Sequence, residues 1–109
     1  MHELAITQSV VEMITERTAG ARVTLVRLDV GKLSGVLPDA LAFCFELVAD
    51  GTSLHGARLE ISEPPGRAHC RSCAADFVLD RPILLCDCGS ADVEVLAGQE
   101  LAIRSVEVA

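Results

Sequence analysis

Four clustered cysteines constrain the fold of this chain more than any other feature. They form the pattern Cys70-x2-Cys73, twelve intervening residues, then Cys86-x-Cys88-Gly89. Two such pairs can surround one metal ion tetrahedrally with four thiolates, which predicts a structural zinc site on Cys70, Cys73, Cys86 and Cys88. With all four positions filled by protein sulfur, no open position is left for catalysis.

Two alternatives remain open for this site. Tetrahedral sulfur also suits iron, as in a rubredoxin-like redox centre, so the pattern does not choose between the two metals. The C-x-C pair is tighter than the common C-x2-C, so His69, next to Cys70, is an alternative ligand to one sulfur. Gly89 is expected to let the second turn adopt a backbone conformation that other residues disfavour.

Composition limits the partners and the compartment. The 109 residues carry 16 acidic and 9 basic side chains, a formal net charge of -7 that repels nucleic acid and anionic membranes. No apolar run approaches the roughly 20 residues of a membrane span, and no basic segment followed by an apolar one suggests a secretory signal. We therefore expect a cytoplasmic protein, in which clustered cysteines bind metal rather than form disulfides.

Hydrophobic periodicity predicts two helices and three strands outside the cysteine segment. In the first helix Leu4, Val11 and Ile14 should share the core face, and Gly20 should occupy the C-terminal cap. In the second, Pro38 fits the first turn and Cys44 should pack in the core. The final strand should contain one register irregularity around Arg104. The elements are expected at residues 3 to about 19, 22–31, 37–51, 57–64 and 100–108.

The order helix, strand, helix, strand, cysteine segment, strand predicts an α+β fold. We expect two helices packed on a small three-stranded sheet, with a zinc-ribbon-like four-cysteine module inserted before the last strand. The Pro64-Pro65-Gly66 run marks the start of the insert. The predicted units are therefore residues 1–66 plus 99–109, and the inserted zinc-binding segment 67–98.

The chain begins Met-His-Glu, which places several nitrogen donors together. The free amine of Met1, the imidazole of His2 and the backbone amides of His2 and Glu3 can close adjacent chelate rings on one ion. A planar nitrogen set is what Ni(II) or Cu(II) prefers. Taken alone, a histidine at position 2 is more often without function than a ligand.

The whole chain, however, resembles the HypA/HybF hydrogenase nickel-incorporation family. The resemblance is carried by "MHELAITQSVVEMI", "RLDVGKLSGVLPDALAFCFELVADGTSLHGARLEI", the cysteine pairs and "GQELAIRSVEV". It implies a nickel metallochaperone in which His2 binds Ni(II), Glu3 contributes and the amino terminus of Met1 lies close by, with zinc on the four cysteines. The C-x-C pair departs from the C-x2-C of many members.

The resemblance also implies partners. Members of that family pass Ni(II) to the precursor of the [NiFe]-hydrogenase large subunit, together with the GTPase HypB, and some also serve urease maturation. Nothing in the chain indicates an enzyme: the segment around Gly31-Lys32 lacks the Walker pattern for phosphate binding. The competing interpretations are a zinc-ribbon module for nucleic acid or protein interaction, and a rubredoxin-like iron redox protein.

Overall fold

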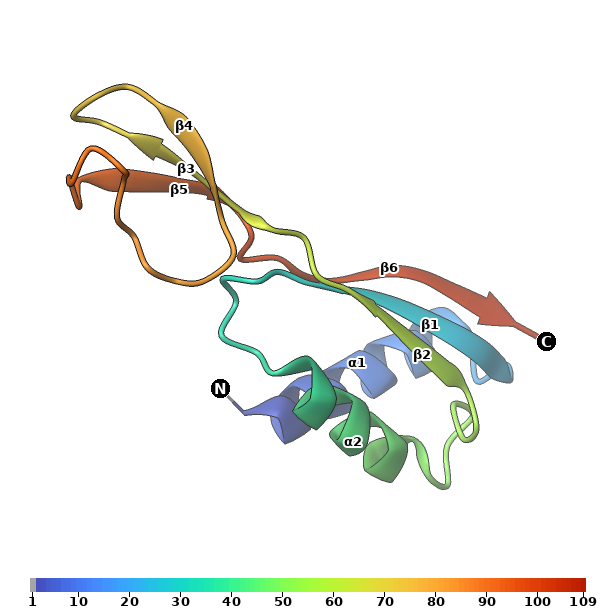
Figure 1. Cartoon of the computed structure of the whole chain (residues 1–109). Coiled ribbons are helices and arrows are strands. Elements are labelled where there is room, and N and C mark those ends of the chain that lie inside the picture. The colour runs from blue at the N-terminus through green and yellow to red at the C-terminus, as the bar shows by residue number, and fades with distance from the viewer. Residues whose placement is uncertain (1) are drawn as a thin grey trace.

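The computed structural model describes residues 2–109 as two helices and six strands, arranged in two separate sheets (Figure 1). The predicted α+β fold is confirmed. The elements are α1 (Glu3–Arg17), β1 (Val23–Val30), α2 (Pro38–Ala49), β2 (Arg58–Ser62), β3 (Gly66–Cys70), β4 (Asp76–Leu79), β5 (Val93–Ala97) and β6 (Leu101–Val108). Neither helix is long and apolar enough to cross a membrane.

The first sheet has the strand order β2-β1-β6, and both helices cover the same face of it (Figure 1). Strand β1 pairs in parallel with β2 and antiparallel with β6. Val26, Leu28 and Val30 alternate along β1 and are buried against the helices, where Leu41 and Phe45 of α2 meet them in one apolar cluster. These three residues follow the two-residue period of a strand that has one face on the core.

The irregularity expected near Arg104 is a β-bulge. Arg27 of β1 pairs with Ser105, whereas the next residue, Leu28, pairs with Ile103, so Arg104 has no opposite partner. The extra residue resets the alternation, and Ile103 and Val106 both pack against the apolar cluster under the helices although they are three positions apart.

The prediction for the core face of α1 was partly wrong. Val11 and Ile14 are buried, but Leu4 is 48% exposed and Thr7 is fully buried in its place. At about 100° per residue, Leu4 falls at one edge of the arc that the buried residues define. The Thr7 hydroxyl donates to the backbone carbonyls of Glu3 and Leu4, and this hydrogen bonding allows a polar residue in the core.

The end of the first helix was predicted two residues too late. Helix α1 stops at Arg17 and its C-terminal cap is Thr18, not Gly20, which adopts a left-handed conformation (φ 76°) in the turn that follows. Pro38 occupies the first turn of α2 as predicted. Cys44 is only partly buried, so it lies at the margin of the core rather than inside it.

The second sheet has the order β4-β3-β5 and extends from the first (Figure 1). Three chain segments meet where the two sheets join, and each contributes a glycine: Gly31, Gly66 and Gly98. A Cβ atom on Gly31 would overlap the Gly98 carbonyl, and one on Gly98 would overlap the Gly66 backbone. These contacts hold the segment that follows β1 directly against the base of the second sheet.

Candidate metal centres

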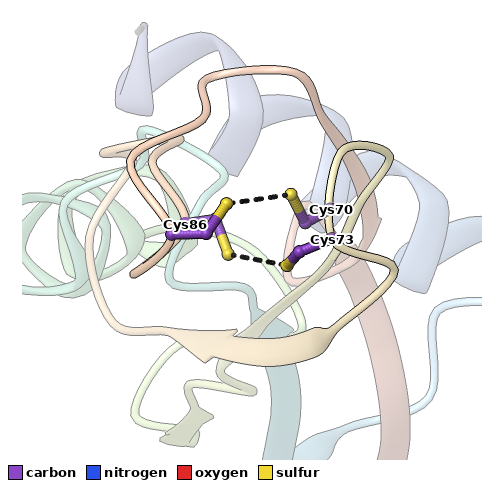
Figure 2. Close-up of side chains that lie close together, drawn as sticks. Cys70, Cys73 and Cys86 are labelled. Atoms are coloured by element: carbon purple, nitrogen blue, oxygen red, sulfur yellow. Dashed lines mark hydrogen bonds between the residues drawn. The ribbon is translucent and has the colours of Figure 1, made fainter.

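The four cysteines converge at the end of the second sheet. Cys70 ends β3, Cys73 lies in the turn that follows, and Cys86 and Cys88 come from the long loop between β4 and β5. Their sulfur atoms all lie within 4.8 Å of one another. In Figure 2, Cys70 and Cys73 lie side by side and face the loop that carries Cys86.

The spacing of the sulfurs fits a tetrahedral metal site. The Sγ atoms of Cys70 and Cys88 are 3.7 Å apart, and those of Cys73 and Cys86 are 3.6 Å apart. A metal–sulfur bond of about 2.3 Å gives a tetrahedron with edges of about 3.8 Å, close to these separations. All four cysteines are free thiols, and the sulfurs are much too far apart for a disulfide.

Tight turns position each cysteine pair. In the first, the backbone N–H of Ala74 donates to the Cys70 carbonyl (2.8 Å), and Ala74 itself takes a left-handed conformation. In the second, the N–H of Gly89 donates to the Cys86 carbonyl (2.8 Å), and Gly89 has a φ of 94°. The conformation expected for Gly89 is confirmed, whereas the left-handed conformation of Ala74 was not predicted, because alanine rarely adopts it.

Two polar contacts join the turns independently of any metal. The hydroxyls of Ser72 and Ser90 are 2.7 Å apart, and the Arg71 guanidinium donates to the Asp92 carboxylate at 3.0 Å. Each contact links the first cysteine turn to the second loop. These side chains therefore hold the two pairs near the geometry that a metal requires, which reduces the ordering that binding must impose.

Within the cluster, one thiol has a lowered pKa and two of its neighbours have raised ones. The pKa of the Cys70 thiol is lowered to about 6 by hydrogen bonds from backbone N–H groups, and the N–H of Cys73 has the largest effect. The N–H of Cys88 lowers the pKa of Cys86, but burial and the neighbouring thiols raise it further, to about 12. One thiolate in the group thus opposes ionisation of the next. A divalent cation would displace the remaining protons, so its affinity should increase with pH.

His69 does not join the sulfur cluster. Its Nδ1 atom lies 2.6 Å from the Asp76 carboxylate, directly across the β3–β4 ladder. The group of potential metal ligands found within residues 2–109 consists of the four cysteines alone. The geometry therefore favours four-sulfur coordination over the alternative in which His69 replaces a cysteine.

The N-terminal residues meet the start of α2. His2 is exposed and precedes α1, and a Glu3 carboxylate oxygen accepts the backbone N–H of Leu37 at 3.2 Å. This hydrogen bond is the largest of the influences that lower the pKa of Glu3 below its ordinary value. Met1, also predicted to contribute to the nickel site, lies outside the described residues.

Asp39 lies in the first turn of α2, two positions after Leu37, whose N–H donates to Glu3. The side chains of His2, Glu3 and Asp39 do not form a group of potential metal ligands in the described part of the chain, where the four cysteines alone do so.

Comparison with known proteins extends over the whole chain. A family model described as "Hydrogenase/urease nickel incorporation, metallochaperone, hypA" matches residues 1–108. Hydrogenase maturation factor HypA of Nostoc sp. is 48% identical over 108 residues, covering 99% of this chain and 96% of the relative. The protein of the same name from Geotalea uraniireducens is 49% identical over 109 residues, covering 99% of both.

Solved structures support the fold. The solution structure of the Ni metallochaperone HypA from Helicobacter pylori aligns with a TM-score of 0.67 at 21% identity, covering 99% of this chain and 97% of that one. Metallochaperones transfer a metal ion and are not catalysts, in agreement with the prediction that this chain is not an enzyme. The match of the family model, together with the two relatives, shows that the chain belongs to the HypA family of hydrogenase/urease nickel-incorporation metallochaperones.

Proposed function

We propose that this chain is a cytoplasmic nickel metallochaperone. It binds Ni(II) at its N-terminus, with the imidazole of His2 as the principal ligand and the amine of Met1 and Glu3 beside it. The family assignment carries this proposal, since the family model names nickel incorporation and spans the N-terminal residues. The exposure of His2 supports it, because a transferred ion must remain accessible to the protein that receives it.

The contact between Glu3 and Leu37 suggests how the two helices contribute. One Glu3 oxygen is already an acceptor for a backbone N–H, which fixes the first turn of α1 beside the first turn of α2. Glu3 then serves the nickel site through its backbone amide or its second carboxylate oxygen.

The second metal in the proposal is a structural zinc ion. The residues that would hold it are Cys70, Cys73, Cys86 and Cys88, whose separations match a tetrahedral sulfur site. Zinc bound there supplies folding free energy rather than a reactive position. In this proposal residues 67–98 form the zinc-binding unit and residues 1–66 with 99–109 form the nickel-binding unit.

The proposed recipients follow from the family. We infer delivery to the precursor of the [NiFe]-hydrogenase large subunit, in cooperation with a HypB-type nickel GTPase, with urease maturation as a second destination. The names of the relatives, which are hydrogenase maturation factors, favour hydrogenase as the principal one. The net charge of -7 continues to exclude nucleic acid as a default partner.

Calorimetric titration of Ni(II) into untagged protein tests the nickel site. His2→Ala should abolish binding, and one extra residue before Met1 should weaken it by displacing the amine. His55→Ala is the matched control, because His55 is also exposed but lies in the loop after α2. Zinc content should be one per chain in all variants. Unchanged Ni(II) affinity in both N-terminal variants would refute the assignment.

A further inference from the structure

An apolar groove runs between α1 and β6 and takes no part in either metal site. It encloses about 690 Å³. Its walls include Ile6 and Met13 of α1 and Leu101, Ile103 and Val106 of β6. Met13 is 50% exposed and Leu101 is 42% exposed, so a continuous apolar surface faces solvent here. Contiguous apolar surface of this kind marks a binding site more often than it marks a defect in packing.

Strand β6 forms one side of the groove and is an edge strand. In the sheet order β2-β1-β6 it pairs with β1, and no second strand joins it anywhere in residues 2–109. Its eight residues therefore present unpaired backbone groups along the outer side (Figure 1). Natural edge strands are commonly protected by charges that discourage further pairing.

The charges of β6 do not protect this edge. The Arg104 guanidinium lies 2.8 Å from the Asp29 carboxylate, and Glu107 pairs with Arg27 at 3.1 Å. Both pairs tie the β6 side chains inward to β1, whose Arg27 and Asp29 alternate with its buried residues. The groove side of β6 is left apolar.

The electrostatics of the groove differ from those of the whole molecule. The chain has 16 acidic residues, yet none of the described residues that line the groove is acidic. Its charged member is Arg17, at the C-terminal end of α1, and Arg17 forms no ion pair within the part of the chain that the structure describes. The groove is therefore suited to an apolar ligand with a negative charge at the Arg17 end.

We propose that the groove is a peptide-docking site, in which an extended segment of a partner protein adds to the sheet beside β6. Backbone groups of the segment pair with the free edge, alternate aliphatic side chains enter the groove between α1 and β6, and an acidic residue at one end pairs with Arg17. This is strand addition, in which main-chain hydrogen bonds supply affinity and side-chain pockets supply selectivity.

A second copy of this chain suits the groove less well. It would bring another formal charge of -7 against the first. The proposal needs only the groove and the edge strand, so it stands or falls independently of nickel binding.

Fluorescence polarisation with a labelled synthetic peptide tests the docking site on the full chain. The probe matches the length of β6, alternates Val and Thr, and carries Asp at both ends. Ser9→Trp fills the groove from an exposed position on α1 and should weaken binding by about tenfold or more. Glu12→Trp is the matched control, because it adds the same side chain to an exposed position of α1 outside the groove. The same peptide with alternate N-methyl groups should not bind, since it lacks the edge hydrogen bonds.

A charge exchange tests the orientation of the ligand. Arg17→Glu should weaken binding of the Asp-ended peptide by about fivefold and favour a Lys-ended one, whereas Arg81→Glu in the β4–β5 loop should change neither. Failure of the unmodified peptide to bind, or binding unaffected by Ser9→Trp and Arg17→Glu, would overturn the proposal. So would sedimentation that shows a dimer which Ser9→Trp converts to monomers, because a second copy would then be the occupant.

Discussion

At the scale of single residues, the four clustered cysteines differ from the fifth by their surroundings. Cys70 and Cys86 are buried and contact other sulfurs, whereas Cys44 stands alone on α2. We expect Cys70→Ser to reduce zinc from one per chain to near zero, and Cys44→Ser to leave it unchanged. Elemental analysis of the purified variants measures both. Zinc retained in the Cys70 variant would show that three sulfurs suffice.

The charge of the Glu3 carboxylate contributes to the stability of the fold. Its folded pKa lies below the ordinary 4.5, because the carboxylate accepts the Leu37 N–H. A carboxyl with a lowered pKa stabilises the fold above its unfolded pKa, and that stability is lost as pH falls through the folded value. The free energy of unfolding should therefore decline more steeply below about pH 4.5 in the native chain than in Glu3→Gln.

Urea unfolding of metal-free protein between pH 3 and 6 measures this difference. Glu12→Gln is the control, because Glu12 is exposed on the same helix and is not the acceptor of the Leu37 N–H. Identical pH profiles for the native chain and Glu3→Gln would mean that the contact with Leu37 contributes nothing to stability. If Glu12→Gln changes the pH dependence of the free energy of unfolding as much as Glu3→Gln does, an acidic group other than Glu3 is responsible for it.

At the scale of elements, the features that could be predicted from the sequence are those that a local pattern of residues determines. Alternation identified β1 and even the bulge at Arg104, and the cysteine spacing identified the metal cluster. Periodicity misplaced Leu4, because Leu4 lies at one edge of the buried arc of α1, where the apolar pattern does not decide exposure. It also missed the contact between Glu3 and Leu37, since pairing across 34 positions leaves no periodic signal.

The junction of the sheets is another feature that local pattern does not encode. A Cβ atom on Gly31 would overlap the Gly98 carbonyl and lie 2.9 Å from the Glu100 nitrogen. Gly31→Ala should therefore destabilise the protein by about 1–3 kcal/mol, the usual cost of overpacking. Gly35→Ala, with no atom within 4 Å and a φ of 78°, should lose only about 1 kcal/mol from its left-handed backbone. Thermal unfolding compares the two, and equal losses would contradict close packing at the junction.

At the scale of the whole molecule, the two sheets differ in what stabilises them. The main apolar cluster lies entirely in the helices, β1 and the loops beside them, with partly buried support from β2 and β6. The second sheet has few buried apolar side chains, among them Ala68 and Leu79, together with the sulfurs of Cys70 and Cys86. A core this small does not maintain a fold without further restraint, whereas a structural zinc ion can supply roughly 10–16 kcal/mol.

Removal of zinc should therefore unfold the second sheet and leave the first sheet and its helices folded. After chelation, amide hydrogens of β3, β4 and β5 should lose exchange protection, while those of β1 and the helices retain it, because the first core needs no metal. Hydrogen exchange read by mass spectrometry at peptide resolution measures this, with the untreated, zinc-bound protein as the reference. Restored zinc should restore protection in the second sheet alone. Simultaneous loss of protection in both sheets would instead mean that the glycine junction makes the molecule a single cooperative unit, and that residues 67–98 are not a separate zinc-dependent fold.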